Sequence, residues 1–141
     1  MKEGDLLEEY DIFLEVEAIP KNLVLVRALV RNYLEVEKIN ETQSVQLISV
    51  VDELVTNVVE HAYKGNDTAD KILRVVLRYN KENIEIIVED FGNGIDKNSK
   101  SKEEGGMGLI IVKKVSDHFI CVEKNQGVMF KIIKKVEKEE I

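Results

Sequence analysis

The segment Val88-Glu89-Asp90-Phe91-Gly92-Asn93-Gly94-Ile95, taken with Gly105-Gly106-Met107-Gly108 downstream, decides how the rest of this sequence is interpreted. Asp90 follows a run rich in β-branched residues, so its carboxylate is expected at the end of a strand. Gly92 and Gly94 allow backbone to approach a ligand, because glycine has no Cβ. The glycines at 105–108 precede a run of helical periodicity, where free N–H groups and the helix dipole favour phosphate. Each glycine segment alone also fits an ordinary turn.

The glycine segments indicate a nucleotide-binding domain, and a column of polar residues upstream strengthens this interpretation. Glu53, Asn57 and His61 are spaced at i, i+4 and i+8, so on a helix they share one face. A carboxylate with an amide one turn away can accept a proton and hold a hard cation through oxygen, which suits phosphoryl transfer from magnesium-ATP. These three residues alone fit a solvated helix stripe equally well. The combination with the two glycine segments favours a binding site.

The remaining hydrophobic pattern predicts alternating strands and helices. Strands are expected at 11–18, 72–79, 84–89, 119–123 and 128–136, and helices from Pro20 to Glu35, from an N-cap at Thr42 to Tyr63, and over 107–117. The long polar stretch between Gly94 and Gly106 is typical of a functional lid. We expect an α+β fold, a two-layer α/β sandwich with a mixed, mostly antiparallel sheet and helices on one face. One domain should cover residues 1–141, with flexible ends at 1–10 and 137–141.

Composition restricts the classes of partner. The net charge of −7 argues against a protein that coats nucleic acid, because phosphate neutralisation needs clustered Lys and Arg. No apolar run approaches the roughly 18–20 residues needed to span a bilayer. The single cysteine gives no sign of an oxidising compartment. We expect a cytoplasmic protein.

The motifs resemble those of the GHKL ATPases, the superfamily of gyrase, heat-shock chaperone, histidine kinase and MutL. The stretch Glu53 to Tyr63 looks like the N box, Asp90 to Gly94 like the first glycine box, and Gly106-Met107-Gly108-Leu109 like the second. Within the superfamily the chain is most similar to the small anti-sigma factor serine kinases of the RsbW type. The resemblance spans nearly the whole chain.

That resemblance implies roles for individual residues. Glu53 would be the general base that deprotonates a substrate serine, Asn57 the magnesium ligand, and Asp90 the acceptor for the adenine amino group. Arg27 matches the family arginine that contacts the sigma factor. The positions implied to bind ATP or ADP are Asn57, His61, Asp90, Gly92, Gly94, Ile95, Gly105, Gly106, Met107, Gly108 and Leu109. Asp52 lies about 100° round the helix from Glu53, which favours Glu53 as the base.

Two departures from the family pattern bear on activity. Val128 follows Gly127 where close relatives carry threonine near the adenine, so a hydroxyl contact is missing. The stretch before the second glycine box is short for the family and has Glu104 where relatives can present an arginine. Nucleotide binding is therefore better supported than kinase turnover.

Three functions follow from these motifs. The first, which the resemblance implies, is an ATP-dependent protein serine kinase that binds a sigma factor and phosphorylates a STAS-type antagonist of the anti-sigma factor. Relatives of this kind are homodimers, so a homodimer is expected here. The second is a non-catalytic module whose bound nucleotide sets the shape of a partner surface. The third is a stand-alone histidine kinase catalytic domain. His61 is not expected to be a phosphoacceptor, because it occupies an ordinary N-box position.

Overall fold

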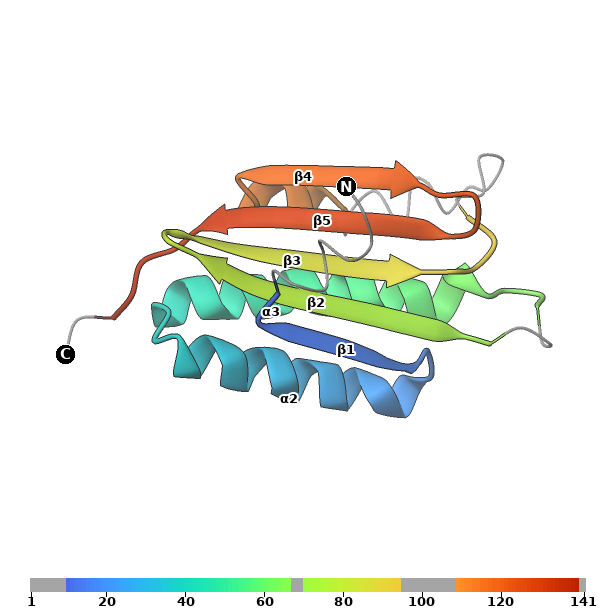
Figure 1. Ribbon diagram of the computed structural model, residues 1–141, viewed down its shortest axis with the longest axis horizontal. Helices are drawn as coiled ribbons and strands as arrows, with labels where there is room; N and C mark the ends of the chain where they lie inside the picture. The colour runs from blue at the N-terminus through green and yellow to red at the C-terminus, as the bar shows by residue number, and fades with distance from the viewer. Residues whose placement is uncertain (1–9, 67–69, 95–108, 140–141) are drawn as a thin grey trace.

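The computed structural model describes residues 10–66, 70–94 and 109–139. Five strands form one sheet in the order β1-β2-β3-β5-β4, and every neighbouring pair of these strands is antiparallel. Figure 1 shows the helices gathered on one face of this sheet. The strands are β1 (Ile12–Glu17), β2 (Ile72–Asn80), β3 (Asn83–Asp90), β4 (His118–Glu123) and β5 (Val128–Lys135). The predicted α+β sandwich is confirmed, with a sheet that is antiparallel throughout the described strands.

Two long helices cover the sheet and form the core with its inner face. Helix α2 (Pro20–Val36) begins with a proline in its first turn, and α3 (Glu41–Asn57) packs beside it. Both helices place aliphatic residues at three- and four-residue steps toward the sheet. The residues with almost no exposed surface include Val26, Val30, Leu34, Leu47, Val50, Val51, Leu54, Leu73, Leu77, Ile84, Ile86 and Ile132.

The second helix differs from the prediction at both ends. Its N-cap is Asn40, not Thr42, because the Asn40 side chain accepts a hydrogen bond from the backbone N–H of Gln43. At the other end α3 stops at Asn57 and continues as a π-helical turn, η1 (Val58–Ala62). Such turns are rare and often occur at functional sites. Periodicity alone had predicted one continuous helix to Tyr63.

The carboxyl-terminal residues are bonded to the connection between α2 and α3. Glu137 accepts a hydrogen bond from the backbone N–H of Asn40 at 2.8 Å, and Glu139 donates to the carbonyl of Lys38 at 2.7 Å. Lys138 forms a β-bridge with Ile39. Residues 137–139, expected to be part of a flexible end, are therefore held by backbone hydrogen bonds. None of the helices in the described part of the chain is long and apolar enough to cross a membrane.

Candidate functional site

Asp90, the last residue of β3, lies at the centre of the candidate site. Its side chain points to the helix-covered side of the sheet and is 4% exposed. Its Oδ1 accepts hydrogen bonds from the backbone N–H groups of Gly92 at 3.0 Å and Val128 at 3.3 Å. Within the described residues, Oδ2 accepts no hydrogen bond. Burial raises the pKa of the Asp90 carboxyl, although the two N–H groups and Lys124 act against that rise.

Two glycines allow the chain to close around Asp90. A Cβ on Gly92 would lie 1.9 Å from the carbonyl oxygen of Ala62, and a Cβ on Gly127 would lie 2.1 Å from the carbonyl oxygen of Asp90. Neither distance can be accommodated without moving backbone. Gly127 also has a φ of +91°, in the left-handed region that favours glycine. The glycine of the predicted motif at 92 is therefore needed for packing against η1.

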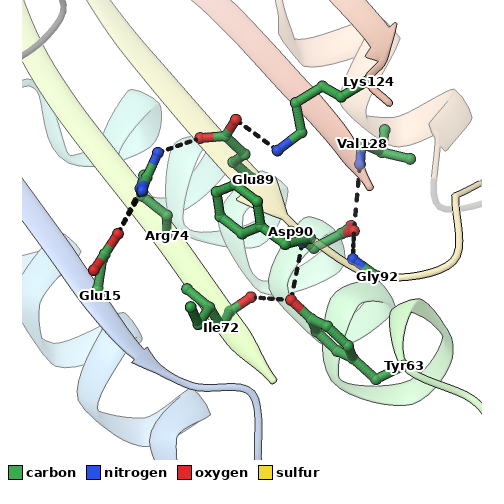
Figure 2. Close-up of polar contacts among 10 residues, drawn as sticks. Glu15, Tyr63, Ile72, Arg74, Glu89, Asp90, Gly92, Lys124 and Val128 are labelled. Carbon is green, nitrogen blue, oxygen red and sulfur yellow. Dashed lines mark hydrogen bonds and ion pairs between the residues drawn. The ribbon is translucent and has the colours of Figure 1, made fainter. Parts of the chain in front are cut away.

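The π turn after α3 is tied directly to the Asp90 turn. The Tyr63 hydroxyl donates to the carbonyl of Ile72 and accepts a hydrogen bond from the backbone N–H of Phe91 at 2.9 Å. Asn93 donates through its backbone N–H to the carbonyl of Ala62 at 2.8 Å. Figure 2 shows Tyr63, Gly92 and Val128 around Asp90, with Val128 coming from the start of β5. The helix that carries the predicted catalytic residues is thus fastened, one turn beyond Asn57, to the turn that carries Asp90.

The predicted polar column lies on α3 and η1. Glu53 and Asn57 are half-buried, whereas His61 is exposed and stands 3.7 Å from the Glu60 carboxylate. The neighbouring carboxylate, Asp52, is turned toward α2, where both of its oxygens accept hydrogen bonds from Nε of Arg27 at 3.0 Å. Of these two adjacent carboxylates, Asp52 is therefore the one that already has an ion-pair partner. The sequence pattern did not predict the ion pair between Arg27 and Asp52.

The remaining predicted ligand positions are only partly described. Gly94 has a φ of +80° with open space around it, and Leu109 begins the described part of the helix at 109–115 and packs on the core. Ile95, Gly105, Gly106, Met107 and Gly108 lie outside the described residues. Their predicted roles stay predictions.

A network of charged and aromatic side chains lies on the outer face of the sheet, behind Asp90. Glu89 accepts hydrogen bonds from Arg74 at 3.0 Å and from Lys124 at 2.7 Å. The ring of Phe91 lies between the same two cations, with the Arg74 guanidinium 4.9 Å and the Lys124 ammonium 3.6 Å from its centroid. Arg74 continues the network to Glu15 on β1 (Figure 2). Because Glu89 and Asp90 are adjacent, they point to opposite faces of the strand.

Comparison with models of known protein families identifies the family of this chain. A model of the histidine kinase-like ATPase domain matches residues 16–134, from β1 to β5. The chain belongs to this family. The serine-protein kinase RsbW from several strains of Staphylococcus aureus is 31% identical over an alignment of 105 residues, and the match covers 64% of this chain and 65% of the relative. The match to these histidine kinase-like ATPase relatives thus covers less than two thirds of their length.

Solved structures share the fold of this histidine kinase-like ATPase domain. The structure of the RsbU and RsbW domains of Rv1364c from Mycobacterium tuberculosis aligns with a TM-score of 0.70 at 18% identity, over 91% of this chain and 33% of that one. The SiaB–SiaC complex from Pseudomonas aeruginosa aligns with a TM-score of 0.67 at 14% identity, over 96% of this chain and 94% of the other. At these identities the likeness is one of fold.

Sequence reasoning missed several residues that build the site. These residues are Tyr63, whose hydroxyl bonds Phe91, Gly127, which packs on Asp90, and Lys124, which bonds Glu89. All three lie in segments interpreted from the sequence as connections or as the end of a motif. Gly127 had a usable signal, because a glycine between two strands often marks left-handed backbone. The Lys124 contact had none, since it joins a turn to a strand end 35 residues earlier.

Proposed function

We propose that this protein is an ATP-dependent protein serine kinase of the RsbW type, which binds a sigma factor and phosphorylates a STAS-type antagonist. The observation that carries the proposal is the buried Asp90 carboxylate, with Oδ1 held by two backbone N–H groups and Oδ2 open within the described residues. A fixed acceptor of this kind suits the exocyclic amino group of adenine. The similarity to the serine-protein kinase RsbW supports the choice of reaction.

The catalytic roles are assigned to Glu53 and Asn57, which are one helical turn apart on α3. In the proposed reaction the serine oxygen attacks the γ-phosphorus, the bond from that phosphorus to the ADP oxygen breaks, and Glu53 takes the serine proton. Asn57, half-buried at the end of α3, would hold Mg²⁺ through its amide oxygen. Magnesium supplies neutralisation of the charge that develops on the transferred phosphoryl group.

The partner surface is proposed on α2. Arg27 is 47% exposed in its side chain and reaches across to Asp52, which is 31% exposed. An ion pair this open to water is weak, so a partner carboxylate can compete for the guanidinium. The exposed apolar residue Val24 precedes Arg27 by three positions and so lies on the same side of α2. The SiaB structure, which shares the fold, was solved with a partner protein, SiaC.

Phosphate transfer can be tested directly with purified components. Radiolabelled ATP and Mg²⁺ are offered together with a panel of STAS-type proteins encoded near the gene, and the label on each protein is followed by gel. We expect label on one STAS-type protein that survives acid, because a phosphoserine ester is acid-stable. Acid-labile label would instead favour a histidine kinase domain. Nucleotide binding without any transfer would favour the non-catalytic module.

Two adjacent carboxylates provide a matched pair of variants for the base. Glu53→Gln removes the proposed base, whereas Asp52→Asn removes the neighbour that is bonded to Arg27. We expect Glu53→Gln to lose transfer while Asp52→Asn keeps it. Equal transfer by Glu53→Gln and the parent protein would refute the assignment of the base.

A further inference from the structure

The Lys124 side chain contacts Glu89 and Phe91, the two neighbours of Asp90, on the face of the sheet opposite the helices. It lies in the connection between β4 and β5, where its backbone N–H donates to the carbonyl of Gly127 at 3.0 Å. Its side chain is 22% exposed and reaches back to Glu89 and to the ring of Phe91. Arg74, on β2, contacts the same aromatic ring through its guanidinium. These four side chains, Arg74, Glu89, Phe91 and Lys124, are termed the clasp.

Within the clasp, Phe91 occupies the position between Asp90 and Gly92 of the motif. Phe91 follows Asp90 and precedes Gly92, whose backbone N–H orients the Asp90 carboxylate. The connection that carries Lys124 also carries Gly127, which packs on the Asp90 carbonyl, and leads directly into Val128, the first residue of β5, whose N–H is the second donor to Oδ1. A shift of Phe91 therefore moves the Gly92 donor, and a shift of the connection moves the Val128 donor; these are the two donors that set the direction of the carboxylate.

We propose that Lys124 is a positioning residue for adenine recognition: through Phe91 and Glu89 it fixes the turn that aims the Asp90 carboxylate at the base. This inference rests on the proposed binding of ATP through Asp90. The chain offers a comparison on the same face of the sheet. Lys131 pairs with Glu85 at 2.6 Å and is 24% exposed, nearly as for Lys124 and Glu89 at 2.7 Å and 22%. Within the described residues Lys131 contacts no part of the Asp90 turn.

The paired variants Lys124→Met and Lys131→Met separate positioning from general stability. Both remove one ammonium group from a similar ion pair, so both should lower the urea midpoint of unfolding, with a further decrease in Lys124→Met from the lost contact with the Phe91 ring. Only Lys124→Met removes a cation from the Phe91 ring. From the strength of such contacts we expect its ATP affinity to fall about three- to tenfold, and its preference for ATP over GTP to fall with it. Lys131→Met should bind both nucleotides as the parent does.

A conservative variant and a nucleotide-free measurement complete the test. Lys124→Arg keeps a cation over the ring and should restore ATP affinity to within about twofold of the parent. Without nucleotide, amide hydrogen exchange of Gly92 and Val128 should be faster in Lys124→Met than in the parent and unchanged in Lys131→Met.

The outcomes distinguish this proposal from the function on which it rests. No ATP binding by the parent protein would overturn the proposed function, and the adenine role of Lys124 with it. A parent that binds ATP while Lys124→Met binds it equally well would overturn the positioning role alone. Unchanged amide exchange in Lys124→Met would overturn the clasp itself, whether or not the parent binds nucleotide.

Discussion

Asp90→Asn is the substitution that separates the binding role of Asp90 from its effect on stability. Asparagine has nearly the same shape and keeps an oxygen that can accept from the N–H groups of Gly92 and Val128. It loses the negative charge, and an amide nitrogen replaces Oδ2. The turn should therefore keep its geometry while the group offered to the ligand changes from an acceptor to a donor.

The loss of nucleotide affinity follows from the hydrogen bond removed. A hydrogen bond to a charged acceptor is worth about 1.5–3 kcal/mol, and 1.36 kcal/mol is a factor of ten. In the variant the amide N–H groups would also face the donor N–H groups of adenine. We expect the dissociation constant for ATP to rise by about ten- to hundredfold or more.

The stability of the nucleotide-free protein should change in the opposite direction. Burial raises the pKa of Asp90 above its ordinary value, so folding favours the protonated carboxyl. The stability gained from that protonation is present below the unfolded pKa and is lost as pH rises through the raised folded pKa. Asparagine stays neutral at every pH and avoids this loss. At neutral pH Asp90→Asn should be more stable than the parent, and the difference should shrink as the pH falls.

Two assays measure the two effects. Calorimetric titration with ATP and Mg²⁺ gives the affinities, and urea unfolding in steps from about pH 7 to about pH 3 extends below the ordinary Asp pKa of about 3.9, where the difference in stability should be smallest. Unchanged ATP affinity in the variant would refute the role of Asp90 in binding the base. A variant that is less stable than the parent at neutral pH would mean that the hydrogen bonds to the carboxylate outweigh its burial.

Further predictions concern packing, catalysis and the partner surface. Gly92→Ala places a Cβ 1.9 Å from the carbonyl oxygen of Ala62 and should cost about 1–3 kcal/mol in urea unfolding; a change below about 0.5 kcal/mol would contradict this. Glu53→Gln should bind ATP as the parent does but slow phosphate transfer by about 10²- to 10⁴-fold in single-turnover assays. A double-mutant cycle of Arg27→Ala and Asp52→Ala should give a coupling energy below about 1 kcal/mol, because the pair is exposed. Arg27→Ala should abolish capture of the sigma factor in a pull-down assay, whereas Asp52→Ala, which frees Arg27, should not weaken it.

The sequence predicted those parts of the fold that depend on local patterns. The alternation around Ile12–Glu17 and the paired runs of β2 and β3 specify strands, and the three- and four-residue spacing in α2 specifies a buried helix face. The position of Asp90 at a strand end was also predictable, because the β-branched run before it stops at a glycine-containing turn.

The features that were missed depend on contacts between distant segments or on competition between equivalent local choices. Asn40 and Thr42 are both good N-caps, and only the path of the preceding chain decides between them. The π turn at Val58–Ala62 has no sequence signal. The carbonyl of its last residue, Ala62, accepts a hydrogen bond from Asn93 in the Asp90 turn, a contact between distant segments that no local pattern predicts. The clasp joins β2, β3 and the connection after β4, which no local pattern brings together.

The central claim, that this histidine kinase-like ATPase domain binds ATP, is tested most directly by the thermal stability of the purified protein with ATP and Mg²⁺. A ligand that binds only the native state at a hundred times its dissociation constant stabilises it by about 2.7 kcal/mol. At about 2–4 °C per kcal/mol for a protein near this size, the melting temperature should rise by about 5–10 °C. An unchanged melting temperature at millimolar ATP and Mg²⁺ would contradict the claim.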